Sequence, residues 1–250
     1  MLRTRVIPVL LLYNGGLYKT IQFKNPRYIG DPINAVRIFN EKEVDELVLY
    51  DISASEQKKS PDFDLIEEIA TECFMPICYG GGIKTEQDAE RLFRLGVEKI
   101  SINTSFVEDE DILRNLSKKF GRSSVVVTID VKKDLLGKYK VYTNRGKDNT
   151  GVNLSDCVRK VEELGAGEMI INNIDRDGTM KGYDIKLLKE ITKISTIPVV
   201  ACGGAGKMED LKEVVVEGGV SGVAAGSLFV YWGSKKGVLI NYPDRKEIDF

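Results

Sequence analysis

The sequence predicts an α/β protein, a closed (β/α)₈ TIM barrel assembled from two duplicated half-barrels. Three observations support this prediction: a length of 250 residues, an alternation of short apolar runs with helix-like segments, and an internal repeat. The repeat matches Pro76 with Pro198 and Gly81 with Gly203, both 122 residues apart. A period of about half the chain is typical of a duplicated half-barrel. Because such barrels take about 250 residues, we expect one domain over residues 1–250.

Short runs rich in apolar residues mark the expected strands. Continuous apolar runs of this length suit strands that are buried on both faces of a parallel sheet. Helix-like segments lie between them, as right-handed crossover connections require. The runs cover roughly residues 5–11, 46–51, 76–79, 98–103, 123–131, 168–173, 198–202 and 222–226.

Capping residues predict the ends of several helices, since Ser, Thr and Asp favour N-termini and glycine follows C-termini. The expected opening and closing residues are Thr85 with Gly96, Ser155 with Gly165, and Asp109 or Asp111 with Gly121. Two longer segments remain. Residues 12–31 are expected to form a functional loop on the catalytic rim. The alternation in residues 138–142 predicts a small hairpin within 132–153.

Composition excludes several classes of protein. The net charge is −2 and no long basic run occurs, which argues against a nucleic-acid partner. No apolar segment reaches the roughly 18 residues of a membrane span. The absence of histidine excludes His-based triads and leaves Asp, Glu, Lys and Cys for proton transfer. The four scattered cysteines, read as reduced thiols without metal spacing, predict a cytoplasmic protein with no metal site and no cofactor.

Two glycine-rich segments predict phosphate sites on opposite sides of the barrel mouth. Glycines let backbone N–H groups approach an anion, and a following helix N-terminus adds a favourable dipole. The first pocket would comprise Gly81, Gly82, Asn103 and Thr104, and the second Gly203, Gly204, Ala225, Gly226 and Ser227. Together they indicate a long ligand with a phosphate at each end. The alternative is that these glycines only make tight turns.

The two halves differ in their acids. Their first strands correspond as residues 6–11 and 125–130, and the second ends in Asp130 where the first ends in Leu11. Reactions that both donate and accept protons need paired groups. Because a leucine cannot transfer a proton, this barrel has lost one carboxylate of such a pair.

At these residues the chain resembles HisF, the cyclase subunit of imidazole glycerol phosphate synthase. The resemblance extends to about residue 230 and is most specific in segments 30–32, 45–48, 80–83, 99–104, 174–179 and 203–208. It implies that a HisH-like glutaminase docks at the barrel bottom and releases ammonia, which passes through the barrel. At the top, this lyase would cleave and cyclise a bis-phosphorylated aminoimidazole carboxamide ribonucleotide.

The resemblance also implies roles for rim residues. In the family, aspartates at the ends of strands one and five act as acid and base; Asp130 matches the second, and Leu11 stands at the first. Lys19 matches the family's loop lysine. Asp177, with Gly178 beside it, is expected at the second phosphate site. Asp51 is a candidate substitute base, although its family position indicates substrate or structural contacts.

The barrel bottom matches the family's ammonia gate. Near the starts of four strands lie two acids and two bases that could pair as a ring: Arg5, Glu46, Lys99 and Glu168. Unpaired charges there would be costly. The alternative is solvated charge at strand ends. Above this gate, small inward residues would leave a narrow passage: Cys78, Ser101 and Cys202.

We therefore expect a conducting subunit that keeps the gate but lacks half of the catalytic pair. Segments 20–30 and 238–243 resemble divergent HisF relatives associated with amidination of surface-polysaccharide sugars, where ammonia passes to a separate ATP-dependent amidotransferase. A second hypothesis is a genuine histidine-pathway cyclase that uses Asp130 and a substitute base. A third, the HisA isomerase barrel, is disfavoured because it also needs paired aspartates and takes no ammonia.

Overall fold

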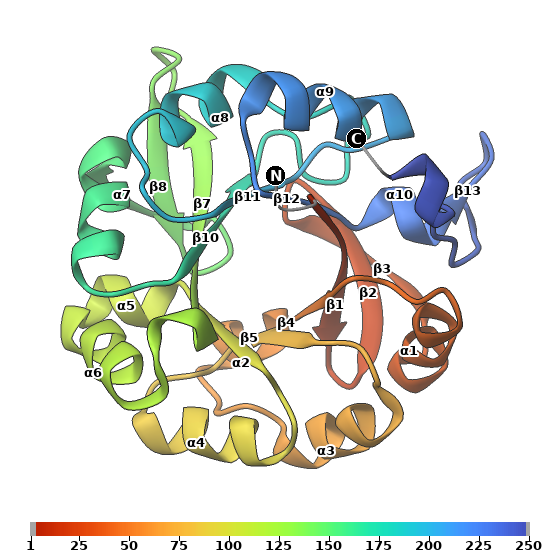
Figure 1. Ribbon diagram of the computed structural model, residues 1–250, viewed down its shortest axis with the longest axis horizontal. Helices are drawn as coiled ribbons and strands as arrows, with labels where there is room; N and C mark the ends of the chain where they lie inside the picture. The colour runs from red at the N-terminus through yellow and green to blue at the C-terminus, as the bar shows by residue number, and fades with distance from the viewer. Residues whose placement is uncertain (1–3, 249–250) are drawn as a thin grey trace.

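A computed structural model describes residues 4–248 of the chain. Within these residues, eight parallel strands close into a barrel, which confirms the predicted fold (Figure 1). Their order around the barrel is that of the sequence, and β12 pairs back with β1. The strands are β1 Arg5–Tyr13, β4 Leu47–Asp51, β5 Ile77–Gly80, β6 Lys99–Ile102, β7 Val125–Lys133, β10 Glu168–Asn173, β11 Val199–Cys202 and β12 Gly222–Ala225.

Helices surround the barrel and cover the outer faces of its strands (Figure 1). They are α1 Pro32–Glu41, α2 Ile52–Gln57, α3 Phe63–Glu72, α4 Glu86–Arg94, α5 Thr104–Glu108, α6 Glu110–Phe120, α7 Leu154–Glu163, α8 Ile185–Thr192, α9 Met208–Gly218 and α10 Ser227–Val230, with 3₁₀ turns at Arg122–Ser124 and Arg245–Glu247. None of the helices in residues 4–248 has the length and apolar character that crossing a bilayer requires.

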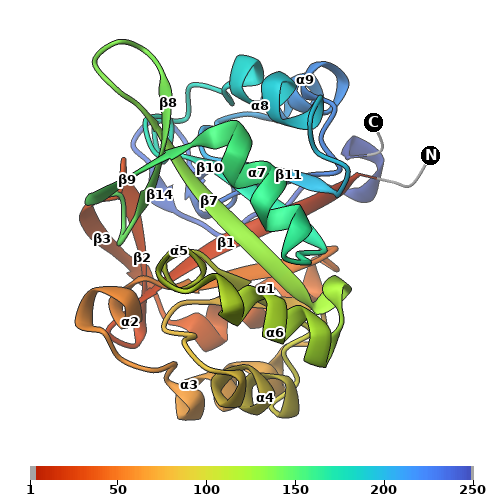
Figure 2. The same cartoon turned by 90° about the vertical axis from the view of Figure 1, so that its left-hand side faces the viewer.

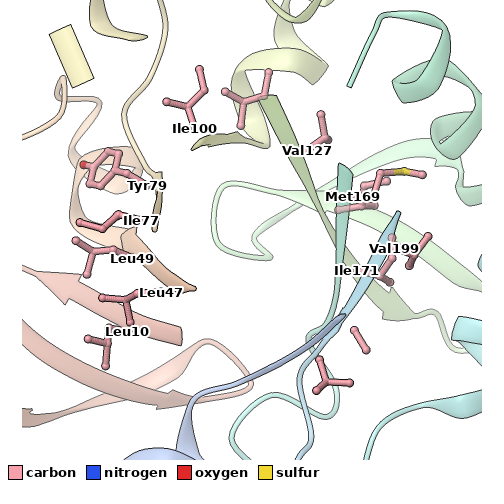
Figure 3. Packing of buried hydrophobic residues seen from close by; sticks show 14 of the residues in the cluster. Leu10, Leu47, Leu49, Ile77, Tyr79, Ile100, Val127, Met169, Ile171 and Val199 are labelled. Atoms are coloured by element: carbon pink, nitrogen blue, oxygen red, sulfur yellow. The ribbon is translucent and has the colours of Figure 1, made fainter. Parts of the chain in front are cut away.

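Alternation along each strand divides the buried residues into two cores. The outer core lies between strands and helices and includes Leu10, Leu49 and Tyr79 (Figure 3). The inner core fills the barrel and takes the residues that alternate with them: Ile7, Val9, Val48, Cys78, Val126, Ile170, Val200, Cys202 and Ala224. Both faces of the strands are therefore apolar, as their uninterrupted apolar runs predicted.

Strand register confirms how the two halves correspond. Leu11 on β1 pairs with Tyr50 on β4, and Asp130 on β7 pairs with Asn172 on β10. Tyr50 and Asn172 are themselves 122 residues apart, which is the spacing of the sequence repeat. Leu11 therefore occupies the position in the first half that Asp130 occupies in the second.

Two hairpins extend from the barrel on the same side, away from the termini (Figure 2). The predicted hairpin after the fifth barrel strand is present as β8 Tyr139–Thr143 and β9 Asp148–Asn153. The expected loop at residues 12–31 is instead mostly β-structure, β2 Gly16–Ile21 and β3 Lys24–Gly30. The overlooked signal is Asn14-Gly15, which connects β1 to β2 with positive φ at both residues, as a two-residue hairpin turn requires. A small hairpin, β13 Tyr231–Trp232 and β14 Gly237–Val238, follows α10.

Most predicted helix starts are confirmed. Thr85 caps α4 in a capping box with Asp88, and Asp109 caps α6. Ser155 does not open α7. Asn153 does, because its side-chain oxygen accepts from the backbone N–H groups of Ser155 and Asp156. An asparagine two residues before the expected cap satisfies the same orphan donors.

The contribution of the Thr85 cap to the free energy of unfolding can be measured. Thr85 Oγ1 accepts from the Asp88 N–H at 3.1 Å, and the Asp88 carboxylate accepts from the Thr85 N–H at 3.0 Å. We expect Thr85→Ala to lower the free energy of unfolding in urea by about 1 kcal/mol. Gln87→Ala, at an exposed site of the same helix, is the control and should change it by less than about 0.5 kcal/mol. Equal effects of the two substitutions would contradict the capping role.

Candidate functional site

The carboxyl ends of the barrel strands surround a cavity of about 370 Å³. Active sites of barrels lie at this end. The structure brings together here every residue that the sequence placed at the mouth: Leu11, Lys19, Asp51, Gly81, Gly82, Asn103, Thr104, Asp130, Asp177, Gly178, Gly203, Gly204, Ala225, Gly226 and Ser227. In residues 4–248, no three His, Cys, Asp or Glu side chains gather closely enough to hold a metal ion.

Asp130 is a buried carboxyl held by two amides. Its Oδ1 accepts from Asn172 Nδ2 at 3.0 Å, and its Oδ2 accepts from Asn103 Nδ2 at 2.8 Å. Burial raises the pKa of Asp130 to about 7; the hydrogen bond from Asn172 opposes this rise and the charge of Asp177 adds to it. A carboxyl with this pKa can give or take a proton at neutral pH.

Leu11 lines the same cavity and packs against the inner core. Its side chain therefore points into the mouth, at the repeat position of Asp130. The hairpin that follows it places no carboxylate there, because Tyr18 is the residue that pairs with Leu11 from β2. The strand-one position supplies an apolar surface and no proton carrier.

Lys19 is buried on β2, with 6% of its surface exposed. Its ammonium donates to the carbonyl of Val9 at 3.1 Å. Burial lowers the pKa of Lys19, and the charge of Asp177 opposes that shift. Burial likewise raises the pKa of Asp177, against the opposing charge of Lys19 and the hydrogen bond from Thr20. Two groups with pKa values displaced toward neutrality thus share the cavity with Asp130.

The carboxylate of Asp51 stabilises the start of helix α2. Its Oδ1 accepts three hydrogen bonds, from Ser53 N at 2.9 Å, Ser53 Oγ at 2.6 Å and Ala54 N at 3.0 Å. These contacts cap the start of α2. Of the two roles considered for Asp51, the structure provides the structural contacts, and an oxygen with three donors is a poor base.

Two positions of the mouth require a glycine for different reasons. A Cβ on Gly204 would lie 2.2 Å from the carbonyl oxygen of Gly182, so close chain packing alone requires a glycine there. A Cβ on Gly226 would lie 1.8 Å from the ammonium of Lys19. Gly226 therefore makes room for a cation beside the backbone of the second predicted phosphate pocket.

Sequence reasoning missed several residues of the cavity. Asn172 holds Asp130, and its own Oδ1 is buried without a hydrogen-bond partner among the described residues. Arg145, on the turn between β8 and β9, reaches the cavity and pairs with Glu56 of α2, which also pairs with Lys147. The repeat could have identified Asn172, since it is the counterpart of Tyr50; no pattern in the sequence marked Arg145.

At the opposite end of the barrel lies the ion-paired floor, formed by Arg5, Glu46, Lys99 and Glu168. Arg5 pairs with Glu46 at 2.5 Å and also with Glu168. Lys99 pairs with both acids at 3.0 Å. The predicted ring of two acids and two bases is therefore present as a neutral, cross-linked cluster.

Pairing in this cluster favours the charged forms of Lys99 and Glu168. Burial alone would lower the pKa of Lys99, but the charges of Glu168 and Glu46 raise it above its ordinary value. Burial would raise the pKa of Glu168, but its hydrogen bond and ion pair with Arg5 lower it. Pairing of this quality offsets the cost of removing the charges from water.

Asp130 provides a titration test. We expect its side-chain carboxyl to titrate near pH 7 in ¹³C NMR, rather than near its ordinary 3.8. Asn172→Leu removes a donor that stabilises the carboxylate, so the midpoint should rise further. Asn149→Leu, the same change on the exposed strand β9, should leave it in place. A wild-type midpoint near 4 would contradict the assigned environment.

The ion-paired floor provides a stability test. Lys99→Met leaves two buried acids with one cation and should lower the free energy of unfolding by about 3 kcal/mol. Lys189→Met breaks an exposed pair with Glu217 on the outside and should cost less than about 1 kcal/mol. Urea titrations at neutral pH would compare them; similar small losses would show that the floor pairs contribute no more than surface pairs.

Comparison with known proteins agrees with this architecture. A family described as "Histidine biosynthesis protein" matches residues 5–235. A Leptospira interrogans protein named "Putative imidazole glycerol phosphate synthase subunit HisF" is 51% identical over 99% of this chain and 98% of its own. A Pseudomonas aeruginosa protein named "Putative imidazole glycerol phosphate synthase subunit hisF2" is 51% identical over 100% of this chain and 99% of its own. An Alkaliphilus metalliredigens protein named "Imidazole glycerol phosphate synthase subunit HisF" is 37% identical over 92% of each chain. The chain belongs to the histidine biosynthesis protein family and, within it, to the HisF subunits of imidazole glycerol phosphate synthase.

Proposed function

We propose that this chain is the ammonia-conducting subunit of a glutamine amidotransferase complex. A HisH-like glutaminase docks at the ion-paired floor, ammonia crosses the barrel, and a separate ATP-dependent enzyme uses it to amidinate a sugar of a surface polysaccharide. The observation that carries the proposal is the contrast between the two ends: a complete ring of ion pairs at the floor, and Leu11 where the mouth needs a second carboxylate.

The floor is suited to contact with a partner that delivers ammonia. Its acids are buried, with side chains 5% and 8% exposed, whereas those of Arg5 and Lys99 are 28% and 22% exposed. The cations therefore face outward and a docked protein can displace them. Above them the inner core is apolar, so that it admits neutral ammonia more readily than ammonium, whose charge would be desolvated.

The rim of the mouth offers a surface for the acceptor enzyme. The two segments that resemble amidination-associated relatives meet there: Arg27 of β3 lies 5.6 Å from the ring centre of Tyr231, which pairs with Val238. Tyr28, Trp232 and Leu239 are more than half exposed around them. Exposed aromatic and aliphatic side chains near an arginine are typical of protein interfaces.

The cavity itself keeps the features of a phosphate ligand site. Glycine-bordered pockets lie on opposite sides, and Lys19 presents a buried cation at Gly226. We propose that a phosphorylated small molecule binds here.

A second candidate function is cyclisation with substitute groups. The specific observation in its favour is the displaced pKa values of Lys19 and Asp177, which place a second proton carrier in the cavity with Asp130. In that case the chain is a working cyclase of histidine biosynthesis, and relatives such as the Alkaliphilus metalliredigens protein carry the name "Imidazole glycerol phosphate synthase subunit HisF".

An assay with excess ammonium separates the two. The purified chain should leave the bis-phosphorylated aminoimidazole carboxamide ribonucleotide unchanged in absorbance, because Asp130 has no partner at Leu11. It should instead raise the glutamine turnover of its glutaminase. Rapid loss of substrate absorbance would refute the conducting role and support the cyclase.

Leu11→Asp tests the missing acid directly. We expect it to raise cyclisation at least tenfold, roughly, since loss of one coupled catalytic group commonly costs orders of magnitude in rate. Leu12→Asp is unsuitable as a control because Leu12 is core; Asn14→Asp, on the turn after β1, adds the same charge outside the cavity lining. No gain with Leu11→Asp would show that the position is not what limits the chemistry.

A further inference from the structure

The mouth cavity ends partway down the barrel. Its lower boundary is made by Val9, Tyr50, Ser101, Thr128 and Cys202. The inner-core residues nearer the floor, such as Val48, Cys78 and Val126, do not line it. The upper part of the barrel interior therefore holds the mouth cavity, and below it these inner-core residues form an apolar neck that rests on the ion-paired floor.

Tyr50 lies at this boundary and its ring covers a position without a side chain. Tyr50 pairs with Gly80 on the neighbouring strand β5. A Cβ on Gly80 would approach the Tyr50 ring to 2.8 Å, so the ring lies flat over the glycine. Inside the barrel at this level, the Tyr50 ring from β4 fills the space that a side chain at Gly80 of β5 would otherwise occupy.

The phenol of Tyr50 is tied to the other side of the barrel. Its oxygen lies 2.6 Å from Thr128 Oγ1 on β7, and Thr128 Oγ1 lies 2.7 Å from Ser101 Oγ on β6. We call Tyr50, Ser101 and Thr128 the hydroxyl plug. Because β5 and β6 separate β4 from β7, the Tyr50 side chain spans the interior rather than following the wall.

The position of the phenol can be narrowed further. Tyr50 packs against the inner core, which includes Cys78 on β5 and Cys202 on β11. These two strands lie on opposite sides of the closed barrel, four strands apart in its order. A Tyr50 side chain that packs on this core and hydrogen-bonds to β7 therefore lies inside the barrel, between the upper cavity and the neck.

The second half of the repeat has no such ring. Asn172, the counterpart of Tyr50, is a shorter side chain that turns to Asp130. Cys202 stands where the first half has Gly80. The plug is thus a departure from the two-fold pattern that is confined to one side of the barrel.

We propose that Tyr50 is a gate inside the barrel, whose ring closes the passage between the neck and the mouth cavity and swings into the cavity to admit one small neutral molecule. For ammonia as the cargo, the gate rests on the proposed function. Tyr50 is half-buried and lines the mouth cavity, whose volume of about 370 Å³ gives the ring room to turn. A hydrogen bond between neutral groups contributes about 1 kcal/mol net, so the latch to Thr128 opens thermally.

The natural cysteines make the gate testable without a partner. Cys202 lines the cavity at the level of the plug, Cys78 lies fully buried below it, and Cys157 is buried on helix α7 outside the barrel. Methylmercury chloride is small, neutral and specific for thiols. Its rate of reaction at each cysteine of the full chain can be followed by peptide mass spectrometry.

In the wild-type chain we expect Cys202 to react and Cys78 to lag far behind it. Tyr50→Ala should bring the rate at Cys78 close to that at Cys202. Thr128→Val and Tyr50→Phe keep the volume and remove the latch, so each should accelerate Cys78 about fivefold, the factor that 1 kcal/mol provides. Tyr79→Phe is the matched control: it removes a buried phenol oxygen that has no partner among the described residues, and should change nothing.

Cys157 reports global opening. If the rate at Cys157 rises together with that at Cys78 in Tyr50→Ala, this substitution has loosened the whole fold. The rates at Cys78 in Thr128→Val and Tyr50→Phe, which conserve the side-chain volume, then decide whether Tyr50 is a gate. The gate is refuted if Cys78 reacts as fast as Cys202 in the wild-type chain, or if none of the three plug substitutions accelerates Cys78 while Cys202 reacts. Labelling needs neither ammonia nor glutaminase, so failure of the conducting role in the ammonium assay leaves this result standing, and the reverse also holds.

Discussion

The register of the closed parallel barrel is the constraint on which the remaining structure depends. In a strand, successive side chains point to opposite faces, so a slip of one residue would exchange the inner and outer cores. Pairing of β1 with β4 and of β7 with β10 turns Leu11 and Asp130 inward together. The same register directs Glu46 and Glu168 to the floor, near the starts of the strands β4 and β10, which carry Tyr50 and Asn172 close to their other ends.

Charge is distributed along the barrel axis in three ways. At the floor, acids and bases neutralise one another in a dense cluster. In the neck, the inner core carries no ionised side chain. At the mouth, Asp130 and Lys19 are buried and Asp177 is half-buried. All three have displaced pKa values, and amide and hydroxyl donors hold the two acids. The charges of the floor are compensated by ion pairs. The groups at the mouth have pKa values closer to neutrality, so their protonation can change where a ligand would meet them.

Departures from the two-fold repeat gather in its first half. Leu11 replaces a carboxylate, Tyr50 replaces an amide, and Gly80 leaves the space that the Tyr50 ring fills. These changes are mutually consistent, since Tyr50 pairs with both Leu11 and Gly80. The first half thus lines the barrel interior with an aromatic ring and an aliphatic side chain, while the second half carries the carboxyl of Asp130 and the amide of Asn172 that holds it.

The sequence by itself determined the fold, the correspondence of the halves, and which residues meet at the two ends, because apolar periodicity and a 122-residue repeat fix which face each strand residue takes. It also predicted that Leu11 takes the position in the first half that Asp130 takes in the second, which the register confirms. Tertiary structure decided what those residues do to one another. Asp51 became a helix cap, Gly204 a site of chain packing, and Asn172 the support of Asp130. The reach of Tyr50 to Thr128 joins strands 78 residues apart, and a contact across the barrel leaves no periodic signal along the chain.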